Sequence, residues 1–272
     1  MKRVIFNQKG GVGKSTITCN LAAISAAGGT RTLVVDLDPQ CNSSHYLLGA
    51  GADEASPTLA DFFGEMLSFS IFGNDPAKFV RPTPFANLDI MPCHAELESL
   101  QGKLESRYKI YKLREALDSL EGYDAIYVDT PPALNFFTRS ALIAADGCII
   151  PFDCDDFSRR ALYSLLENVQ EIRQDHNPAL RVEGIVVNQF QARARLPQKL
   201  VNELREEGLP VLASTISASV KIRESHEEAR PLINLAAGHK VTREFVALHQ
   251  ELLESRRPAR AAKARGKARA AA

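Results

Sequence analysis

A glycine-rich segment near the amino terminus constrains the fold of this 272-residue chain more than any other feature. The segment, residues 9–16, reads KGGVGKST, and it follows the short apolar run of residues 4–6. After it, Ile17, Leu21 and Ile24 recur at the spacing of one helix face. The order of strand, glycine-rich loop and helix predicts an α/β fold in which the loop faces an anion.

The physical chemistry of this loop favours a bound phosphate chain over a plain turn. Its glycines allow backbone angles that other residues avoid, so successive N–H groups can turn inward beside the positive end of a helix dipole. Lys14 can reach nucleotide phosphates, and the Ser15 hydroxyl suits Mg²⁺. The Walker A motif would place its first glycine at position 8, where Gln8 stands. We expect these phosphate-binding residues: Lys9, Gly10, Gly11, Val12, Gly13, Lys14, Ser15 and Thr16.

Lys9 is a second lysine at the mouth of the loop, and an ordinary P-loop does not need it. With this lysine, residues 9–16 resemble the deviant Walker A motif of the ParA/MinD family of P-loop ATPases, and of its short Soj-like partition ATPases in particular. In that family the additional lysine reaches across a nucleotide-sandwich homodimer to the partner's phosphates. The resemblance implies ATP as the nucleotide, and it implies that Lys9 acts catalytically in trans, as an arginine finger does, alongside Lys14.

Two carboxylates follow the next predicted strand. Residues 32–36 form a continuous apolar run that ends in Asp36, and Asp38 comes two positions later in the sequence DLDPQ. Carboxylates at the carboxyl end of a parallel strand face the ligand crevice, although a turn or helix-cap carboxylate would give the same pattern. The segment resembles the second ParA motif, which implies that Asp38 positions the attacking water and that Asp36 lies near Mg²⁺. Cys41 stands where the family usually has glycine.

A third carboxylate ends a later apolar run. Residues 125–129 read AIYVD and resemble a Walker B strand, whose terminal Asp129 would hold Mg²⁺ through water. The residues that follow, 130–132, make a rigid exit because each proline fixes its own φ and restricts its predecessor. The sequence DTPP is again ParA-like. We therefore expect Ser15, Asp36 and Asp129 at the metal, and Asp38 and Asp129 among the catalytic residues.

Three polar residues are candidates for contacts with the nucleotide base. Asn188 ends a predicted strand at the position where the family reads the adenine edge, and an amide can both donate and accept a hydrogen bond there. A strand-terminal turn asparagine is the alternative explanation. In ParA relatives the loop after the last strand carries a proline and an asparagine that touch the base, and Ser217 and Ser219 stand in those places here.

Basic residues on two loops fit DNA binding. Arg193 and Arg195 lie on one loop, and Lys221 and Arg223 lie on another. In ParA relatives these loops present basic residues from the dimer to the phosphates of double-stranded DNA, without reading its sequence. Such binding weakens steeply with salt. Without the resemblance, ordinary solvated lysines and arginines would explain the four residues equally well.

Alternating strand and helix patterns predict an α/β fold with a mostly parallel twisted sheet and helices on both faces, the P-loop NTPase fold. We expect one ATPase domain over residues 1–254. The expected strands are residues 3–7, 32–36, 88–91, 123–130, 147–151, 182–188 and 211–216. The expected helices are residues 15–27, 95–121 with a break near 107–109, 157–174, a helix ending at 207, and 241–253.

Composition narrows the class of protein. No apolar run approaches the roughly 20 residues of a membrane span, and we expect no signal peptide. The five cysteines form no Cys-x-x-Cys pair, which favours buried thiols in a reduced, cytoplasmic protein. The chain has 33 basic and 33 acidic residues, but seven of the basic ones lie in residues 255–272. We expect this tail to be disordered alone and the remainder to be acidic.

Residues 50–86 are the hardest to interpret. We expect short helices after Thr58 and near Phe69, and the segment's large apolar side chains are too many for a disordered loop. Packing against the body is the main expectation, and a partner surface is the alternative. Partner specificity would then lie in residues 50–86 and on the surface of residues 95–121.

The resemblance covers residues 9 to about 230, and it implies a partition or positioning ATPase. An ATP-bound homodimer would bind DNA nonspecifically at the nucleoid, and a ParB-like or other adaptor would stimulate hydrolysis. A MinD-like membrane switch is the alternative, but the tail offers alanine where an anchoring helix needs bulky apolar residues, so we expect no stable membrane anchor. The cysteine spacing does not match an iron–sulfur ATPase, and the few residues before Lys9 leave no room for a helix-turn-helix repressor domain.

Overall fold

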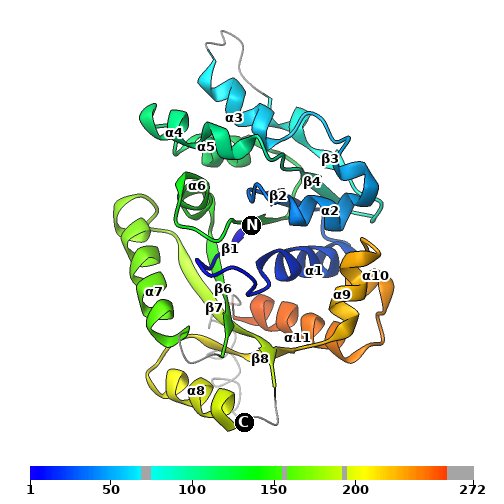
Figure 1. The fold of residues 1–272 in the computed structure, drawn as a ribbon, viewed down its shortest axis with the longest axis vertical. Coiled ribbons are helices and arrows are strands. Elements are labelled where there is room, and N and C mark those ends of the chain that lie inside the picture. Colours follow the sequence, from blue (N-terminus) through cyan, green and yellow to red (C-terminus); the bar gives the residue numbers. More distant parts are fainter. Residues whose placement is uncertain (69–74, 155–157, 192–194, 256–272) are drawn as a thin grey trace, which may run out of the picture.

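The structure is a computed structural model that describes residues 1–68, 75–154, 158–191 and 195–255 (Figure 1). Within these residues, eight strands form one sheet in the order β3-β4-β2-β5-β1-β6-β7-β8, and β3 alone runs antiparallel to its neighbour. This confirms the expected α/β fold. The strands are β1 (Lys2–Ile5), β2 (Thr32–Asp36), β3 (Arg81–Pro82), β4 (Leu88–Met91), β5 (Ala125–Asp129), β6 (Gly147–Asp153), β7 (Arg181–Phe190) and β8 (Val211–Ser217).

Helices cover both faces of the sheet, as Figure 1 shows. The α-helices are α1 (Lys14–Ala27), α2 (Asn42–Leu48), α3 (Leu59–Leu67), α4 (Leu97–Ser106), α5 (Lys112–Ser119), α6 (Phe136–Ala144), α7 (Ser158–Asp175), α8 (Arg195–Glu206), α9 (Val220–Glu227), α10 (Leu232–Leu235) and α11 (Lys240–Glu254). Two short 3₁₀ helices are η1 (Gly49–Ala52) and η2 (Pro76–Phe79). Within the described residues, none of the helices combines the length and apolar character needed to cross a bilayer.

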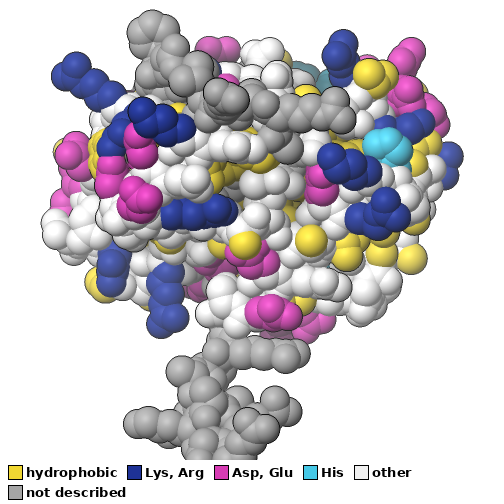
Figure 2. Space-filling view, turned by 90° about the horizontal axis from the view of Figure 1, so that it is seen from below, with side chains coloured by type: hydrophobic (Ala, Val, Ile, Leu, Met, Phe, Trp, Pro, Cys, Tyr) yellow, Lys and Arg dark blue, Asp and Glu magenta, His cyan; other side chains and the backbone are white. Residues whose placement is uncertain are grey.

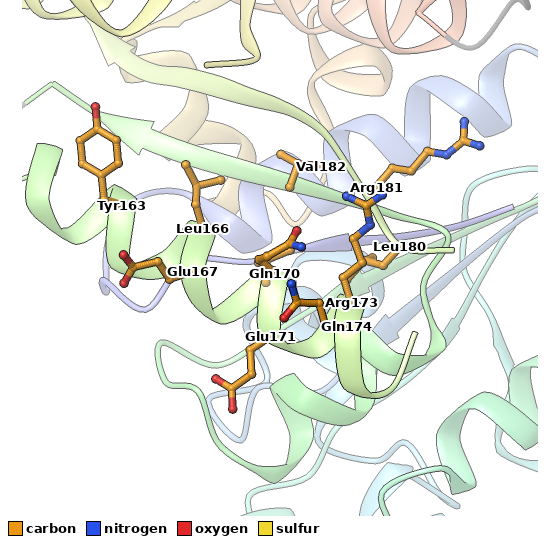
Figure 3. A pocket seen from close by; sticks show the side chains of 11 residues that line it. Tyr163, Leu166, Glu167, Gln170, Glu171, Arg173, Gln174, Leu180, Arg181 and Val182 are labelled. Atoms are coloured by element: carbon orange, nitrogen blue, oxygen red, sulfur yellow. The ribbon is translucent and has the colours of Figure 1, made fainter. Parts of the chain in front are cut away.

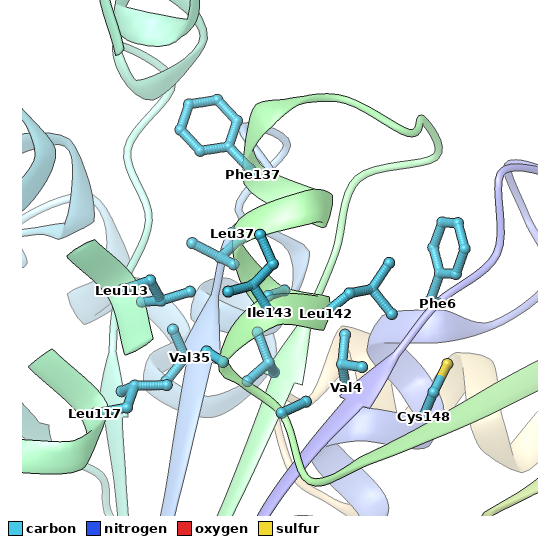
Figure 4. Packing of buried hydrophobic residues seen from close by; sticks show 14 of the residues in the cluster. Val4, Phe6, Val35, Leu37, Leu113, Leu117, Phe137, Leu142, Ile143 and Cys148 are labelled. Carbon is cyan, nitrogen blue, oxygen red and sulfur yellow. The ribbon is translucent and has the colours of Figure 1, made fainter. Parts of the chain in front are cut away.

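The strands send alternate side chains into two buried clusters, one on each face of the sheet. Along β2, Leu33 and Val35 join the cluster that α3 to α7 cover, and Val34 joins the cluster that α1 and α11 cover. Figure 4 shows part of the first cluster, with Leu142 of α6 close to Val4 of β1. Burial on both faces explains why these strands read as continuous apolar runs.

Seven strands were expected from the sequence, and all seven are present with ends within two residues of the expected ones. The expected break in residues 95–121 separates α4 from α5. The structure adds α2, α6, α9, α10 and the short strand β3, which the sequence did not predict. Every residue of α6 except Arg139 is buried, so this helix has no amphipathic stripe to reveal it.

The segment of residues 50–86 packs against the body where the structure describes it. The expected helix after Thr58 is α3, and Thr58 caps it through a reciprocal pair of hydrogen bonds with Asp61. Phe62, Phe63 and Phe79 are fully buried in the first cluster, which confirms packing as the expectation for these residues. Phe69 and the helix expected near it lie outside the described residues, as does most of the basic tail, residues 256–272.

Candidate functional site

The carboxyl ends of three neighbouring strands bring the predicted site residues together. β2, β5 and β1 are adjacent and parallel, and Asp129 is in register with both Asp36 and Ile5. The glycine-rich loop connects β1 to α1, and Asp38 follows the end of β2 by two residues. The loop and the three carboxylates therefore share one edge of the sheet, where ligands bind in open α/β folds.

Glycine is required at two positions of the loop. Gly11 has a φ of 76° and Gly13 a φ of 88°, in the left-handed region that favours glycine. A Cβ on Gly13 would also lie 2.3 Å from Nδ2 of Asn188. At Gly10 and Gly11, by contrast, an added Cβ would meet nothing within 4 Å. The space in front of these two glycines is therefore open, as a loop that receives phosphates requires.

The two lysines of the loop occupy different places. Lys14 is buried in the cradle, and its Nζ donates a hydrogen bond of 3.2 Å to the carbonyl oxygen of Lys9. Desolvation lowers the pKa of Lys14, and the nearby Asp129 and Asp38 oppose this shift. The Lys9 side chain is 42% exposed, and its Nζ lies 2.8 Å from Oδ2 of Asp153 at the end of β6. Lys14 therefore lines the cradle and Lys9 stands at its outer rim.

Two buried carboxylates are held by serines of α2. Ser44 donates to Oδ2 of Asp36 from both its backbone N–H, at 2.8 Å, and its hydroxyl, at 2.7 Å. The Ser43 hydroxyl donates to Oδ2 of Asp129 at 2.7 Å. Burial raises the pKa of Asp36, and burial also raises the pKa of Asp129 to about 6, although hydrogen bonds from Ser15 and Ser43 oppose the second shift. No local motif pointed to these serines, because the fold alone brings α2 to the strand ends.

Asp38 is positioned by a tight turn. Its Oδ1 accepts a hydrogen bond of 3.0 Å from the N–H of Gln40, and its backbone N–H donates to Oδ1 of Asp36 at 3.2 Å. Its carbonyl oxygen accepts from the N–H of Cys41 at 2.8 Å. Asp38 is nearly buried, and it lines the same cleft as Lys14. Its carboxylate is therefore fixed at the wall of the phosphate cradle, where a water-positioning group would be needed.

A cleft of 330 Å³ lies between the loop, the turn after β2 and α9. Its lining adds four residues that sequence reasoning missed: Gln40, Asn42, Pro132 and His226. Nε2 of His226 lies 2.8 Å from Oγ1 of Thr16, and the His226 ring stacks on Tyr46 with ring centres 4.1 Å apart. Burial lowers the pKa of His226, so the ring is neutral near pH 7. No local motif could have revealed His226, because it lies 210 residues after Thr16.

Comparisons with known proteins identify the family. A family model described as an AAA domain matches residues 2–182. The chromosome partitioning protein ParA of Myxococcus xanthus is 32% identical over 93% of this chain and 88% of its own length. The chain belongs to the ParA/MinD family of P-loop ATPases. The sporulation initiation inhibitor protein Soj of Bacillus subtilis is 31% identical over 84% of this chain and 88% of that protein.

A solved structure supports the fold assignment. The McdA(D38A)–ATP complex from Cyanothece covers 93% of this chain and 96% of its own, with a TM-score of 0.80 at 23% identity. Membership of the ParA/MinD family makes the chain an ATPase that uses ATP and Mg²⁺. Its residues fit both: the loop offers an open glycine cradle, and the side chains of Asp36, Asp129 and Ser15 would supply the oxygen ligands that Mg²⁺ prefers. The ion would neutralise phosphate charge at this site.

Of the three residues expected at the adenine base, Asn188 contacts the phosphate loop, whereas Ser217 and Ser219 bond to α11 and α9. Nδ2 of Asn188 donates to the carbonyl oxygen of Val12 at 2.9 Å, so this amide supports the phosphate loop. Ser217 donates from its N–H and its hydroxyl to Glu244, at 2.8 Å each. Ser219 caps α9 and accepts from the N–H of Lys221. The 330 Å³ cleft formed by the described residues is not lined by Asn188, Ser217 or Ser219.

The residues expected to contact DNA are only partly described. Lys221 lies in the first turn of α9 and forms an ion pair with Glu224, and Arg223 is exposed two residues later. Arg195 begins α8, and its side chain lies outside the described part of the structure. Arg193 also lies outside the described residues. Lys221 and Arg223 were expected on a loop, and the structure corrects this by placing both on helix α9, which begins at Val220.

A larger hollow of 770 Å³ lies elsewhere on the molecule (Figure 3). It is formed by one face of α7, by Leu180 just before β7, and by the first residues of β7, Arg181 and Val182. This is the amino-terminal end of β7, so the hollow lies at the edge of the sheet opposite the phosphate loop. Charged and amide side chains such as Glu167, Gln170 and Arg181 rim it (Figure 3). Although this hollow is larger than the cleft, it lies away from the phosphate loop and is therefore not the ATP site.

Proposed function

We propose that this ATPase is a ParA-like positioning switch. In this proposal ATP closes a homodimer, the dimer binds double-stranded DNA without sequence preference, and an adaptor protein stimulates hydrolysis and releases it. Repeated cycles would segregate or position a plasmid, a chromosome region or a protein cluster. The relatives named above support the proposal, because one is a chromosome partitioning protein and another is named Soj.

The position of Lys9 carries the proposal. Lys14 already fills the phosphate cradle of its own chain, whereas the Lys9 ammonium stands at the outer rim and is held there by Asp153. A lysine in this place is suited to leave one carboxylate and contact the phosphates of a second molecule. That movement would exchange one charged partner for another of the same sign, so its electrostatic cost is small.

The surface of the protein carries both basic and acidic side chains, so the proposed DNA surface depends on a few lysines and arginines. On the face that Figure 2 shows, lysine and arginine side chains lie interspersed with aspartates and glutamates. Pairing two copies would double the number of cations available to one duplex. We propose Lys221 and Arg223, together with Arg193 and Arg195, as the phosphate-binding residues.

The adaptor surface is proposed on the helices α3, α4 and α5. These helices pack on the face of the sheet that the first cluster covers, near the end that holds β4 and the edge strand β3 (Figure 1). Tyr108, in the turn between α4 and α5, is 89% exposed and has a φ of 54°. A large aromatic side chain held outward by a tight turn is a common anchor of protein interfaces.

Molar mass in solution tests the first step of the cycle. We would measure light scattering of the purified protein with Mg²⁺ and ATP, with Mg²⁺ and ADP, and without nucleotide. The proposal predicts a dimer with ATP and a monomer in the other two states. The same molar mass in all three states would contradict an ATP-dependent switch, even if the protein hydrolysed ATP.

A further inference from the structure

Two cysteines lie side by side at the turn that holds Asp38. Cys41 follows this turn, and Cys93 follows β4, the strand that pairs with β2 in parallel. Because parallel neighbours end at the same edge of the sheet, the two loops run next to each other. Ser44 links them: its hydroxyl accepts from the N–H of Cys93 at 2.9 Å and donates to Asp36.

Both thiols pack in or against the first buried cluster, and they differ in exposure. Cys93 is 3% exposed, with its Sγ 3.6 Å from the carbonyl oxygen of His94. Cys41 is half-buried, and its Sγ lies 3.4 Å from the carbonyl oxygen of Pro39. The chain thus holds one accessible thiol and one sheltered thiol on adjacent loops, which is the arrangement of a reactive cysteine and its resolving cysteine.

We propose that Cys41 and Cys93 form a redox modification site, which a peroxide converts into an intramolecular disulfide. Helix α2 begins directly after Cys41, and its Ser44 accepts a hydrogen bond from the N–H of Cys93, so the two cysteines flank one hydrogen-bonded junction between the two loops. This modification also explains a departure from the family pattern. Cys41 adopts a φ of 53°, a conformation in which glycine would be less strained, so cysteine stands there despite the backbone.

The chemistry balances in two steps. The Cys41 thiolate attacks one oxygen of hydrogen peroxide, so an S–O bond forms, the O–O bond breaks, and hydroxide leaves as water after taking a proton. The Cys93 sulfur then attacks the sulfur of the Cys41 sulfenic acid. The S–S bond forms, the S–O bond breaks, and the departing hydroxide takes the Cys93 proton as a second water. The two thiols lose two electrons, and the peroxide gains them.

The environment of each thiol suits its role in these steps. The hydrogen bond from Cys93 lowers the pKa of Cys41, which favours the attacking thiolate. The same hydrogen bond, together with burial, raises the pKa of Cys93, which keeps its proton until the second step. Cys19 and Cys148 are buried elsewhere, and burial raises the pKa of both.

The disulfide would restrain the turn that positions Asp38. The N–H of Cys41 bonds to the carbonyl oxygen of Asp38, so a covalent link from Cys41 to β4 fixes this turn against the sheet. We expect the cross-link to lower the rate of ATP turnover and to leave ATP binding largely intact, since Lys14 and the glycines are untouched. This consequence rests on the proposed role of Asp38, whereas formation of the disulfide does not.

The test begins with the reduced full-length protein. Graded hydrogen peroxide is followed by alkylation of free thiols, intact mass measurement and peptide mapping. The proposal predicts a loss of two hydrogens per chain, a peptide that joins Cys41 to Cys93, and reversal by dithiothreitol. Both thiols remaining free, a link to any other cysteine, or Cys41 sulfinic acid without a link would overturn it.

Matched variants separate the modification from general damage. Cys41→Gly, which suits the positive φ, and Cys93→Ala should form no such link, whereas Cys154→Ser, which removes the other half-buried cysteine, should form it as the parent chain does. Peroxide should slow ATP turnover several-fold in the parent and in Cys154→Ser, and not in Cys41→Gly. A complete cross-link with unchanged turnover would refute the effect on Asp38, and neither readout requires DNA binding.

Discussion

At the scale of single residues, two lysines five positions apart have opposite surroundings. Lys14 lies buried in the phosphate cradle, and Lys9 lies at the rim in contact with Asp153. Both lysines and the three carboxylates could be predicted, because each belongs to a local motif at a strand end. Ser43 and His226 could not be predicted, because only the packing of α2 and α9 against α1 brings them to the site.

Replacing Lys9 tests the role in trans. We expect Lys9→Ala to keep nucleotide binding, because Lys14 is unchanged, and to lower adaptor-stimulated hydrolysis by about a thousandfold, the scale of an arginine finger. Lys199→Ala is the control, since Lys199 is also exposed and also paired with a carboxylate, Glu203, and lies outside the proposed adaptor surface. Steady-state ATPase assays compare the two. Hydrolysis of Lys9→Ala at the level of Lys199→Ala would exclude a catalytic Lys9.

Replacing Asp38 separates catalysis from dimer closure. We expect Asp38→Ala to hydrolyse ATP about 100-fold more slowly, because the water is no longer aligned, and to persist as an ATP-bound dimer. Asp75→Ala is the control for loss of the turn hydrogen bond. The Asp75 side chain accepts from the N–H of Ala77, as the Asp38 side chain accepts from the N–H of Gln40. Light scattering with ATP gives the oligomeric state. An Asp38→Ala chain that stays monomeric with ATP would make Asp38 a structural residue.

At the scale of elements, the sequence predicted strands better than helices. Strands buried on both faces appear as apolar runs, and their alternate side chains enter both clusters. α6 was missed because it is buried almost all round, and α2 and α10 were missed because they are short. α11 was predicted, because one face of it is buried along Val241, Phe245, Leu248 and Leu252.

The stability of the α11 contact should depend on pH through His249. Burial and the nearby Arg3 lower the pKa of His249 to about 4 from its usual 6.5. Above pH 6.5 the ring is neutral in the folded and the unfolded state. As the pH falls towards 4, only the unfolded chain takes up the proton, so the folded state loses stability. After a discount for partial exposure, this loss is about 2 kcal/mol.

Chemical denaturation between pH 7.5 and 4.5 measures this effect. We expect His249→Gln to flatten the decline in the free energy of unfolding relative to the parent chain. His94→Gln should follow the parent, because His94 lies on the surface with about half of its side chain exposed. Parallel curves for the parent and His249→Gln would mean that His249 does not contribute to the pH dependence.

At the scale of the whole molecule, the nucleotide cleft and the end of α11 lie at opposite edges of the sheet. The cleft is at the carboxyl ends of the strands, whereas α11 ends beside the start of β1, where Arg3 donates to the carbonyl oxygen of Leu252. Apart from the tail the chain carries 26 basic and 33 acidic residues. DNA binding that responds to ATP should therefore depend on the basic residues near the cleft. Attraction between DNA and the positive charge of the tail should not change with the bound nucleotide.

Binding to random-sequence duplex DNA tests the central claim most directly. Fluorescence anisotropy would be measured with ATP, with ADP and without nucleotide, at low and moderate salt, for the full-length chain and for a chain that ends at Ser255. The account predicts binding with ATP that survives the truncation and weakens by about tenfold or more as salt rises. Binding that is equal in all nucleotide states and disappears on truncation would contradict it, because the tail alone would then hold the DNA.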